Sequence, residues 1–403
     1  MRILHVSKFA QVTGGVERHM LDLVQLQTQA GHQTEIFSSE FRGSTLSLNP
    51  SEATVAGAAQ ATARILWADD ARRSLKKHIR GFAPDVVHFH SVYHQLSASV
   101  LHSVPKSASA VMTLHDYKLA APCYLLLRDG QPCIECVGST FPFPAVHHRC
   151  VKDSRAASLV CATEQVVHVR SYRTKVDRFI VPSLFAASLL SRSRAVPQDR
   201  VVVVPHGIPM PPAKARPSES RRFVFLGRLS SEKGLEDLLA AWDTSGVGEA
   251  GYSLDVVGDG PAAGLLKGAP ASVVHKGWLD RPAVASCLAS ARCVVIPSRF
   301  HETFGLSAAE ALAAGVPLIA ARSGALSELV ENSAAGALFQ PGNRAELSRL
   351  LEEHSQSAFG PELNARGLAG RDFVSRKLSP ALMLERTLDV YREAARTRGG
   401  DLQ

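Results

Sequence analysis

Twelve short runs rich in Val, Ile, Leu and Phe recur along the chain, separated by stretches with helical spacing. Strands that alternate with helices predict parallel sheets, because parallel neighbours need a long crossover connection. Runs such as VVVV and CVVIP are apolar throughout, which is typical of strands covered on both faces. The predicted strands are Arg2–Val6, Gln33–Phe37, Asp85–Phe89, Ala110–Leu114, Arg178–Val181, Val201–Val204, Arg222–Leu226, Ser253–Val257, Ser272–His275, Arg292–Ile296, Pro317–Ala320 and Gly336–Phe339.

The length of 403 residues suits two domains rather than one core. A Pro-rich segment, GIPMPPAKARPSES at 207–220, is interpreted as part of a linker at 206–220. The predicted fold class is α/β: two doubly wound, Rossmann-like domains, 1–205 and 221–377, that face a cleft. A last helix at about 378–398 is expected to pack back on the first domain. Ligands of such sheets bind at the carboxyl ends of the strands.

The net charge of +8 is unevenly distributed. Residues 1–205 carry 23 Lys and Arg against 15 Asp and Glu, so the whole excess lies there. That excess favours an acidic partner: membrane lipid, a phosphorylated acceptor or nucleic acid. No run approaches the roughly 18 apolar residues that a membrane span needs, and MRILHVS is expected to be a first strand and not a signal peptide. A cytoplasmic protein is therefore expected.

Two loops that follow predicted strands can hold phosphate. Gly14 and Gly15 precede a helix expected to begin near Val16, where bare amides can approach an anion. In GRLSSEKGLEDLL, Arg228 and Lys233 flank a tight turn into a helix and can clamp a diphosphate. A loop that needs positive φ and a solvated charged turn remain the structural alternatives.

Two glutamates frame the stretch HETFGLSAAEALAAGVP at 301–317. Residues 307–314 predict a helix that ends at Gly and then Pro. Glu302 then lies in the preceding loop and Glu310 on the second turn, both near a helix N-terminus, where negative charge is favoured. An ordinary first-turn carboxylate is the alternative.

The sequence GDGPAAG mimics a dinucleotide-binding fingerprint through Gly258 and Gly260. Asp280 lies 20 residues beyond Gly260, but it precedes Arg281-Pro282 as a helix N-cap would. In a true fingerprint the acid ends the next strand. A dinucleotide-dependent oxidoreductase is therefore an alternative, as is a basic nucleic-acid-binding protein, which the absence of a recognisable reading module disfavours.

Taken in order, these loops resemble the retaining glycosyltransferases of family 4, the group 1 transferases of the glycosyltransferase-B architecture. The resemblance covers nearly the whole chain. Its specific parts are ETFGLSAAE with the trailing GVP, GRLSSEKG, VGDGP, the early GGVE and the HD of TLHDY.

The resemblance implies a role for each matching residue. Arg228 and Lys233 match residues that hold the donor's diphosphate, and Glu310 the carboxylate that binds the ribose. Glu302 matches the carboxylate that contacts the donor sugar. The other expected donor-binding residues are Gly15, Phe304, Gly305 and Leu306, and the expected catalytic residues are His115, Glu302, Lys233 and Arg228.

The resemblance further implies a UDP- or GDP-linked sugar donor and a saccharide or polyprenyl-lipid-linked acceptor in polysaccharide or glycolipid biosynthesis. Retention of anomeric configuration is implied, and no obvious nucleophile for a double displacement is present, so front-face attack is favoured. Cations and a helix N-terminus can stabilise the leaving diphosphate, so no cofactor is required for catalysis. His115 is either part of the catalytic machinery or only a sugar ligand.

Four cysteines lie within 28 residues: Cys123, Cys133, Cys136 and Cys150. Their spacing, C-x9-C-x2-C-x13-C, is compatible with a structural zinc site, with His147 and His148 as substitute ligands. A loop of buried free thiols is the alternative. Some family members that act on surface polysaccharides carry a similar Cys-rich insert after His-Asp, which suggests that the insert shapes the acceptor side.

One amphipathic helix is predicted over residues 64–82. Its apolar stripe comprises Ala68, Ala71, Leu75, Ile79 and Phe82, and its basic face comprises Arg73, Lys76, Lys77 and Arg80. A solvated face is the default interpretation, and peripheral contact with an anionic membrane is the functional one.

Overall fold

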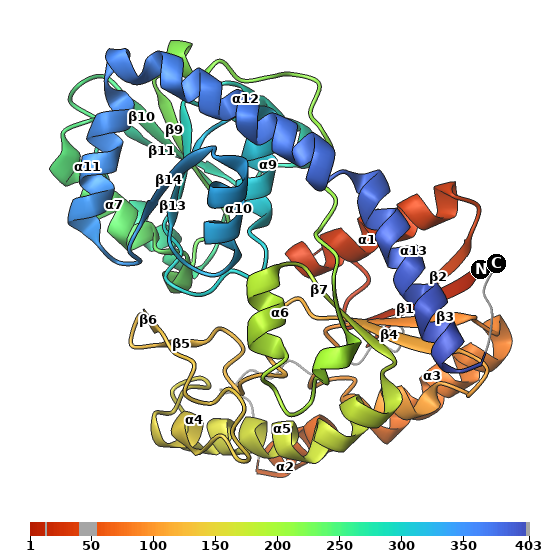
Figure 1. The fold of residues 1–403 in the computed structure, drawn as a ribbon. Coiled ribbons are helices and arrows are strands. Elements are labelled where there is room, and N and C mark those ends of the chain that lie inside the picture. The colour runs from red at the N-terminus through yellow and green to blue at the C-terminus, as the bar shows by residue number, and fades with distance from the viewer. Residues whose placement is uncertain (13, 40–54, 400–403) are drawn as a thin grey trace. The chain divides into compact units, whose positions relative to one another are not determined.

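The computed structural model describes residues 1–12, 14–39 and 55–399. The chain divides into two compact units, each built on a six-stranded sheet (Figure 1). The first unit comprises Met1–Leu125, Ile134–Pro205 and the chain from Met383 onward, and the second comprises Leu126–Cys133 and His206–Leu382. Among the described residues, no helix is both long and apolar enough to cross a bilayer.

The sheet of the first unit is parallel throughout, in the order β2-β1-β3-β4-β7-β8. Its strands are β1 (Arg2–Ser7), β2 (Gln33–Ser38), β3 (Val86–His90), β4 (Ser109–Thr113), β7 (Arg178–Val181) and β8 (Val201–Val203). The short strands β5 (Leu127–Arg128) and β6 (Gln131–Pro132) form a separate antiparallel pair that belongs to the second unit.

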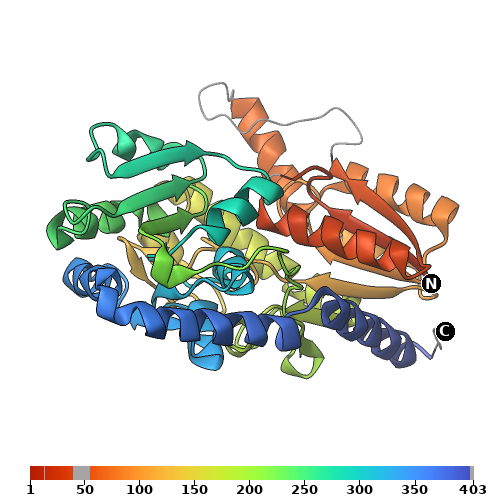
Figure 2. The same cartoon turned by 90° about the horizontal axis from the view of Figure 1, so that it is seen from above.

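Two layers of helices cover this first sheet. Helices α1 (Gly15–Gln29) and α13 (Pro380–Thr397) lie on the same face, where Leu23 and Tyr391 join a core with Ile3 and Val86 (Figures 1 and 2). The helices on the other side are α2 (Val55–Leu66), α3 (Asp69–Phe82), η2 (Ala98–Ser103) and α5 (Arg155–Lys175), while α4 (Phe143–His147) packs on α5, and α6 (Leu184–Leu190) follows β7.

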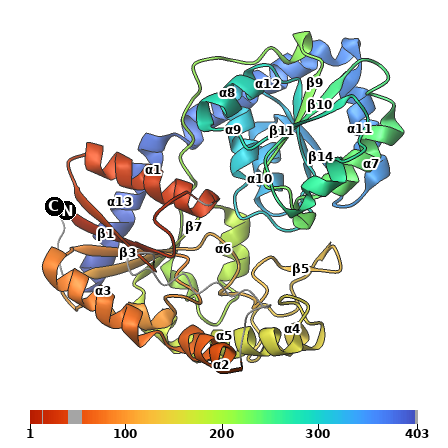
Figure 3. The same ribbon diagram turned by 180° about the vertical axis from the view of Figure 1, so that it is seen from behind.

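The sheet of the second unit is also parallel, in the order β11-β10-β9-β12-β13-β14. Its strands are β9 (Arg222–Leu226), β10 (Ser253–Val257), β11 (Val273–Gly277), β12 (Cys293–Ile296), β13 (Leu318–Ala321) and β14 (Gly336–Phe339). One face packs on α7 (Leu235–Ser245) and α11 (Arg344–Ser355), and the other on α8 (Arg281–Ala289), α9 (Leu306–Ala314), α10 (Ala325–Ser333) and α12 (Gly360–Lys377) (Figure 3).

All twelve predicted strands are present, with ends that differ by at most two residues. Strands β3, β4, β12 and β13 lie inside the two sheets and are buried along their whole length, whereas the VVVV run forms β8, a partly buried edge strand. The prediction of two doubly wound α/β sheets is confirmed, because both sheets are parallel and helices cover both faces of each.

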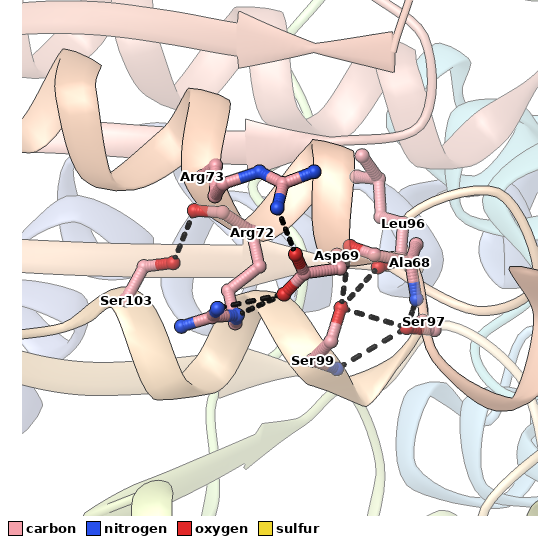
Figure 4. A network of polar contacts seen from close by, with 8 residues as sticks. All are labelled: Ala68, Asp69, Arg72, Arg73, Leu96, Ser97, Ser99 and Ser103. Carbon is pink, nitrogen blue, oxygen red and sulfur yellow. Dashed lines mark hydrogen bonds and ion pairs between the residues drawn. The ribbon is translucent and has the colours of Figure 1, made fainter.

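The predicted helix over residues 64–82 is wrong in one respect, because the chain breaks at Trp67 and Ala68 to give two helices. Ser97 and Ser99 capture the backbone at the break: Ala68 N donates to Ser97 Oγ (3.0 Å), and Ser99 Oγ donates to Ala68 O (2.9 Å) (Figure 4). The first bond takes the place of the bond that the Ala68 amide would make in a continuous helix, while Ala68 O also accepts from Arg72 N (3.0 Å) in the first turn of α3. The apolar stripe is as predicted, with Ala68, Ala71, Leu75, Ile79 and Phe82 all buried.

The segment interpreted as a linker belongs to the second unit. Ala215 is buried, and its amide donates to Ala314 O over 2.9 Å. The guanidinium of Arg292 donates to the carbonyl oxygens of Pro217, Ser218 and Ser220. Backbone carbonyls that a linker would expose to water are thus satisfied inside the fold.

Candidate functional site

In the second unit the strand order reverses between β9 and β12, which lie side by side at the centre of the sheet. A doubly wound sheet opens a crevice at such a reversal, outside the carboxyl ends of the two strands. The loops that leave these ends are 227–234 after β9 and 297–305 after β12. They contain Arg228, Lys233 and Glu302, so the structure brings together the residues that the sequence placed in separate motifs.

The central contact of this site is an ion pair between the two loops. Lys233 Nζ lies 2.7 Å from Glu302 Oε1, and the buried Ser298 hydroxyl donates to the same oxygen over 2.7 Å. The ammonium also lies 4.9 Å from the centroid of the Phe300 ring. The Glu302 side chain is 11% exposed and that of Lys233 27%, so this pair is held in a partly desolvated position.

The two loops approach each other too closely for a side chain at Gly234. A Cβ there would lie 1.9 Å from Pro297 O, and the residue has a φ of 72°, which favours glycine. The amide of Arg299 donates to Glu232 O over 2.9 Å, which fixes the same junction. Lys233 is therefore positioned by the backbone of the loop that carries Glu302.

The buried carboxylate of Asp237 holds the loop 297–305 in place through Arg299. Asp237 on α7 accepts two hydrogen bonds from Arg299 (2.6 and 2.7 Å) and one from Arg344 on α11 (2.8 Å). Burial alone would raise the pKa of Asp237, but these guanidinium groups outweigh it and hold the pKa below its usual range. Asp237 and Arg299 were not identified from the sequence, since their spacing carries no motif.

The predicted helix at 307–314 is confirmed as α9, which begins at Leu306. Gly305 occupies the N-cap with a φ of 85°, and no side chain caps the helix. The first amides of an α-helix have no acceptor within the helix, so this terminus favours an anion. Phe304 is buried against the His206 ring, 4.7 Å between centroids, and Glu310 is half-buried on the second turn.

The main chain at Glu302 is also fixed from the strand side. Glu302 forms an isolated parallel bridge with Gly324, and Ala325 N donates to Glu302 O over 2.9 Å. A Cβ on Gly324 would lie 2.3 Å from Glu302 O, so only glycine fits there. Ser323 Oγ donates to Phe300 O over 2.7 Å, which ties the same loop to the end of β13.

The fingerprint-like glycines serve backbone packing. A Cβ on Gly258 would lie 1.9 Å from Gly227 O, and one on Gly260 would lie 2.3 Å from Leu229 O. The turn after β10 thus packs against the loop that carries Arg228, and it leads into 3-10 structure rather than an α-helix. Asp280 caps α8 as predicted, accepting from Ala283 N over 2.9 Å. The structural basis for the oxidoreductase alternative is thereby removed.

In the first unit the strand order reverses between β1 and β3, and polar side chains gather there too. Gly15 is the first residue of α1, and His115 lies two residues beyond β4. The loop before α1 includes residue 13, which lies outside the described residues. Four buried histidines lie around the partly buried His115: His5 on β1, His19 on α1, and His88 and His90 on β3.

A chain of hydrogen bonds links three of these rings. His90 Nδ1 lies 3.1 Å from His115 Nε2, and His90 Nε2 lies 3.1 Å from His5 Nδ1. Burial lowers the pKa of His5 to about 4, and burial together with the neighbouring histidines holds the pKa values of His90 and His115 well below the usual range. All three rings are therefore neutral near pH 7.

The residue after His115 begins a second buried polar group that the sequence did not reveal. Asp116 Oδ1 accepts from Lys118 N over 2.9 Å, and burial raises the pKa of Asp116 to about 6. Lys118 Nζ lies 3.0 Å from Glu164 Oε2, with both side chains almost fully buried. Their attraction lowers the pKa of Glu164 in spite of its burial.

The zinc prediction stays a prediction. Within the described residues, metal-ligating atoms of three or more side chains lie within 4.8 Å of one another in two places, and neither place includes Cys123, Cys133, Cys136 or Cys150. The two places are His5, His88 and His90, and His94, Cys161 and Glu164. The first is filled by hydrogen bonds, and in the second the Lys118 ammonium already pairs with Glu164.

Family models match both units of the chain. Residues 13–210 match the model for glycosyltransferase family 4, and residues 220–356 match the model for glycosyl transferases group 1. The chain belongs to this glycosyltransferase family. The predicted resemblance is confirmed, while the Cys-rich subgroup within it stays a prediction.

Similar proteins include two named glycosyltransferases. The chain is 32% identical over 252 residues to a D-inositol 3-phosphate glycosyltransferase from Segniliparus rotundus, covering 56% of this chain and 54% of that protein. It is 41% identical over 113 residues to a GDP-mannose-dependent phosphatidylinositol dimannoside mannosyltransferase from Mycobacterium tuberculosis, covering 27% of this chain and 29% of that protein. The matches thus span about half, or less, of the length of these relatives.

Among solved structures, Anabaena Alr3699/HepE in complex with UDP matches with a TM-score of 0.66 over 96% of this chain and 99% of that one. The sequence identity is 16%, so this likeness shows the fold alone. The glycosyltransferase-B fold class is confirmed.

Proposed function

We propose that this glycosyltransferase moves a sugar from a nucleoside diphosphate sugar to a saccharide or lipid-linked acceptor, with retention of anomeric configuration. The observation that carries the proposal is the Lys233–Glu302 pair, 2.7 Å apart, at the strand-order reversal of the second unit. A cation held beside an uncapped helix N-terminus suits a leaving diphosphate, whose negative charge grows as the glycosidic bond breaks.

Each predicted residue has a distinct part in this proposal. Arg228 is exposed in the loop after β9 and binds the diphosphate together with Lys233. The amides of Phe304 to Leu306 receive the phosphate oxygens at the start of α9, and Glu310 accepts hydrogen bonds from the ribose hydroxyls. Glu302 orients Lys233 and contacts the donor sugar. Catalysis requires no metal in this scheme.

The donor and acceptor classes rest on the family members. One relative uses GDP-mannose and is named for a phosphatidylinositol dimannoside, and one structural neighbour holds UDP. Both bases are therefore candidates here. A lipid-linked acceptor would bring the first unit to an anionic membrane surface, which its excess of basic residues favours.

A thermal-shift panel of UDP, GDP and their sugar conjugates tests the proposal, because a ligand at 100 times its Kd stabilises the folded state by about 2.7 kcal/mol. One nucleotide family is expected to raise the melting temperature. A flat response to the whole panel would contradict the proposal.

Substitutions then locate the site. Arg228→Ala and Lys233→Ala are each expected to weaken nucleotide diphosphate binding by about 1.5–3 kcal/mol. Arg222→Ala is the matched control, since Arg222 is also exposed but lies at the start of β9, at the end of the strand opposite to the Arg228 loop. Calorimetric titration that gives equal affinities for Arg228→Ala and Arg222→Ala would remove the assignment.

Glu310→Ala is expected to weaken nucleotide binding through the ribose. The same substitution is expected to change the affinity for a ribose-free diphosphate by less than about twofold, since that ligand lacks the hydroxyls. Comparable losses for both ligands would show that Glu310 acts on the phosphates or on the fold instead.

A further inference from the structure

We propose that Gln27, acting through His5 and His90, fixes the tautomer of His115, so that His115 carries its proton on Nε2 and presents Nδ1 as an acceptor. This inference rests on the proposed function for its catalytic meaning, because His115 is the expected residue near the reacting sugar. Gln27 is then a positioning residue, and it lies on α1 in a position that no motif marks.

The donor-to-acceptor direction of these hydrogen bonds is set at the Gln27 amide. Gln27 Oε1 lies 2.7 Å from His5 Nε2, and Gln27 Nε2 donates to Tyr391 Oη over 3.0 Å. An amide oxygen only accepts, so His5 carries its proton on Nε2. Gln27 and Tyr391 are 364 positions apart and both are buried, which leaves water no place in this contact.

A neutral imidazole has one N–H and one acceptor nitrogen, so the polarity passes unchanged along the chain. With its proton on Nε2, His5 accepts at Nδ1 from His90 Nε2. His90 therefore accepts at Nδ1, and the donor there is His115 Nε2. Each of the two 3.1 Å contacts between ring nitrogens therefore holds one proton. His90 Nε2 carries it in the first contact, and His115 Nε2 carries it in the second.

The second arm of the network agrees with this direction. The Tyr391 hydroxyl has one proton, and because it accepts from Gln27 it donates to His88 Nδ1 over 2.7 Å. His88 then donates from Nε2 to Thr113 Oγ1 over 2.7 Å. The ring nitrogens of His5, His88 and His90 are thus all paired without a charged ring.

Exchanging Oε1 and Nε2 of the Gln27 amide would reverse the direction of every hydrogen bond in the network, and the distances do not fit that arrangement. A Tyr391 hydroxyl that donates to an amide oxygen favours about 2.7–2.8 Å, while an amide nitrogen that donates favours about 2.9–3.0 Å. The observed Gln27–Tyr391 separation of 3.0 Å fits the amide nitrogen as donor. Burial of His5, His19, His88, His90 and His115 keeps a charged ring out of the cluster.

The consequence concerns what His115 can do. A ring that donates through Nε2 into the protein interior has Nδ1 as its acceptor nitrogen, so it accepts a hydrogen bond from a hydroxyl and does not donate one. The reversed tautomer would present a donor at the same place. The buried network thus sets the chemical character of a residue that lies three hydrogen bonds from Gln27.

The direct test is nuclear magnetic resonance of protein with 15N-labelled histidine, because the protonated and unprotonated nitrogens of a neutral ring give separate signals. His115→Asn identifies the signals of that ring by their loss. Wild type is expected to show a proton on Nε2 of His5, His90 and His115. A proton on Nδ1 of His115 would overturn the proposal, as would a stoichiometric metal bound by these rings.

Two substitutions separate the positioning role from the fold. Gln27→Met removes the anchor and is expected to leave His115 as a mixture of tautomers, whereas Gln27→Glu keeps an acceptor at this position and is expected to preserve the Nε2 form. Thr113→Val is the matched control, since it removes a partner of His88 on the arm that does not lead to His115. An unchanged His115 spectrum in folded Gln27→Met would overturn the proposal.

Activity gives a second, separable result. In Gln27→Met the kcat for sugar transfer is expected to fall by about tenfold or more with the donor KM within about twofold, as when a histidine is held in the wrong tautomer. Gln27→Glu is expected to restore most of kcat. If no nucleotide sugar supports transfer, the proposed function fails, while the spectra still decide the tautomer.

Discussion

The two units share a parallel, doubly wound architecture with different strand orders, and they differ in the side chains that lie where the strand order reverses. In the second unit the strand-order reversal holds charged pairs, Lys233 with Glu302 and Arg299 with Asp237. In the first unit the corresponding reversal is surrounded by buried histidines that burial keeps neutral.

The difference follows from what each edge must stabilise. A diphosphate needs fixed cations, and cations near a protein surface are tolerated when carboxylates pair with them. A buried neutral ring instead offers one donor and one acceptor of defined direction. Two parallel, doubly wound sheets therefore supply charge at one reversal and hydrogen-bond direction at the other, and the following predictions test that contrast.

The largest effect is expected from Asp237→Ala in the second unit. The Asp237 side chain is 3% exposed and pairs with both Arg299 and Arg344, so its loss removes the buried partner of a partly buried guanidinium. Removal of one member of a buried pair costs about 3–5 kcal/mol of folding free energy. Urea unfolding measures it.

Glu236→Ala is the matched control for that prediction. Glu236 pairs with the same two arginines, but its side chain is 58% exposed, so a cost below about 1 kcal/mol is expected. Equal costs for the two substitutions would show that burial does not set the strength of the charged network.

Acid is expected to weaken the first unit more than the second. Burial lowers the pKa values of His5 and His94 to about 4 and that of His19 to about 3. A histidine whose pKa is lower in the folded chain binds its proton on unfolding. Its contribution to stability is complete above the unfolded pKa of about 6.5 and is lost as pH falls toward the folded pKa.

Between pH 7 and pH 5.5 the free energy of unfolding is expected to fall by about 1 kcal/mol for each of these three histidines, or by about 3 kcal/mol together. In the second unit, His354, with a pKa lowered to about 4, contributes one such loss. The fluorescence of Trp67 follows the urea unfolding of the first unit, and that of Trp242 follows the second, so the two midpoints can be measured separately. Equal midpoint shifts in variants that keep only one of these reporters would contradict the contrast.

Gly324→Ala separates backbone strain from a clash at the charged site. Gly31 in the first unit has a φ of 87° and nothing within 4 Å of a Cβ, so Gly31→Ala reports the conformational cost alone, about 1 kcal/mol. Gly324→Ala adds a contact of 2.3 Å with Glu302 O and is expected to cost about 2 kcal/mol more. It should also weaken nucleotide binding, which Gly31→Ala should leave unchanged.

The smallest effect is expected on the exposed basic face of α3. Asp69 pairs with Arg73 over 2.6 Å, so Lys76, Lys77 and Arg80 are the cations available to an anionic membrane. Each contributes on the order of 1 kcal/mol near such a surface. Vesicles with anionic lipid, sedimented at about 50 mM salt, where the screening length still exceeds 10 Å, measure the binding.

In that assay, Lys76→Ser with Lys77→Ser is expected to release more protein than Arg73→Ser, because Asp69 already offsets the Arg73 charge. Wild-type protein that ignores anionic vesicles would favour a water-soluble acceptor. Neutral vesicles provide the control for apolar insertion.

The fold was largely predictable because local patterns in the sequence, such as apolar runs and helix-ending glycines, indicate its strands and helices. Short runs rich in Val, Ile, Leu and Phe located all twelve strands, and Gly315 with Pro317 marked the end of α9. The break at Trp67 and Ala68 was not predictable, since helical spacing continues through it and the competing bonds come from Ser97 and Ser99, about 30 positions away.

The sequence by itself determined which loops carry the candidate site of the second unit. Arg228, Lys233 and Glu302 follow two strands whose carboxyl ends must adjoin, and Glu310 lies on the helix that comes next. Only the tertiary structure decided what those residues touch: Lys233 pairs with Glu302 across 69 positions, and Gln27 meets Tyr391 across 364. Periodicity specifies which face a side chain takes within its own element. The register and packing of distant elements specify its partner, and with it the charge or tautomer that the side chain carries.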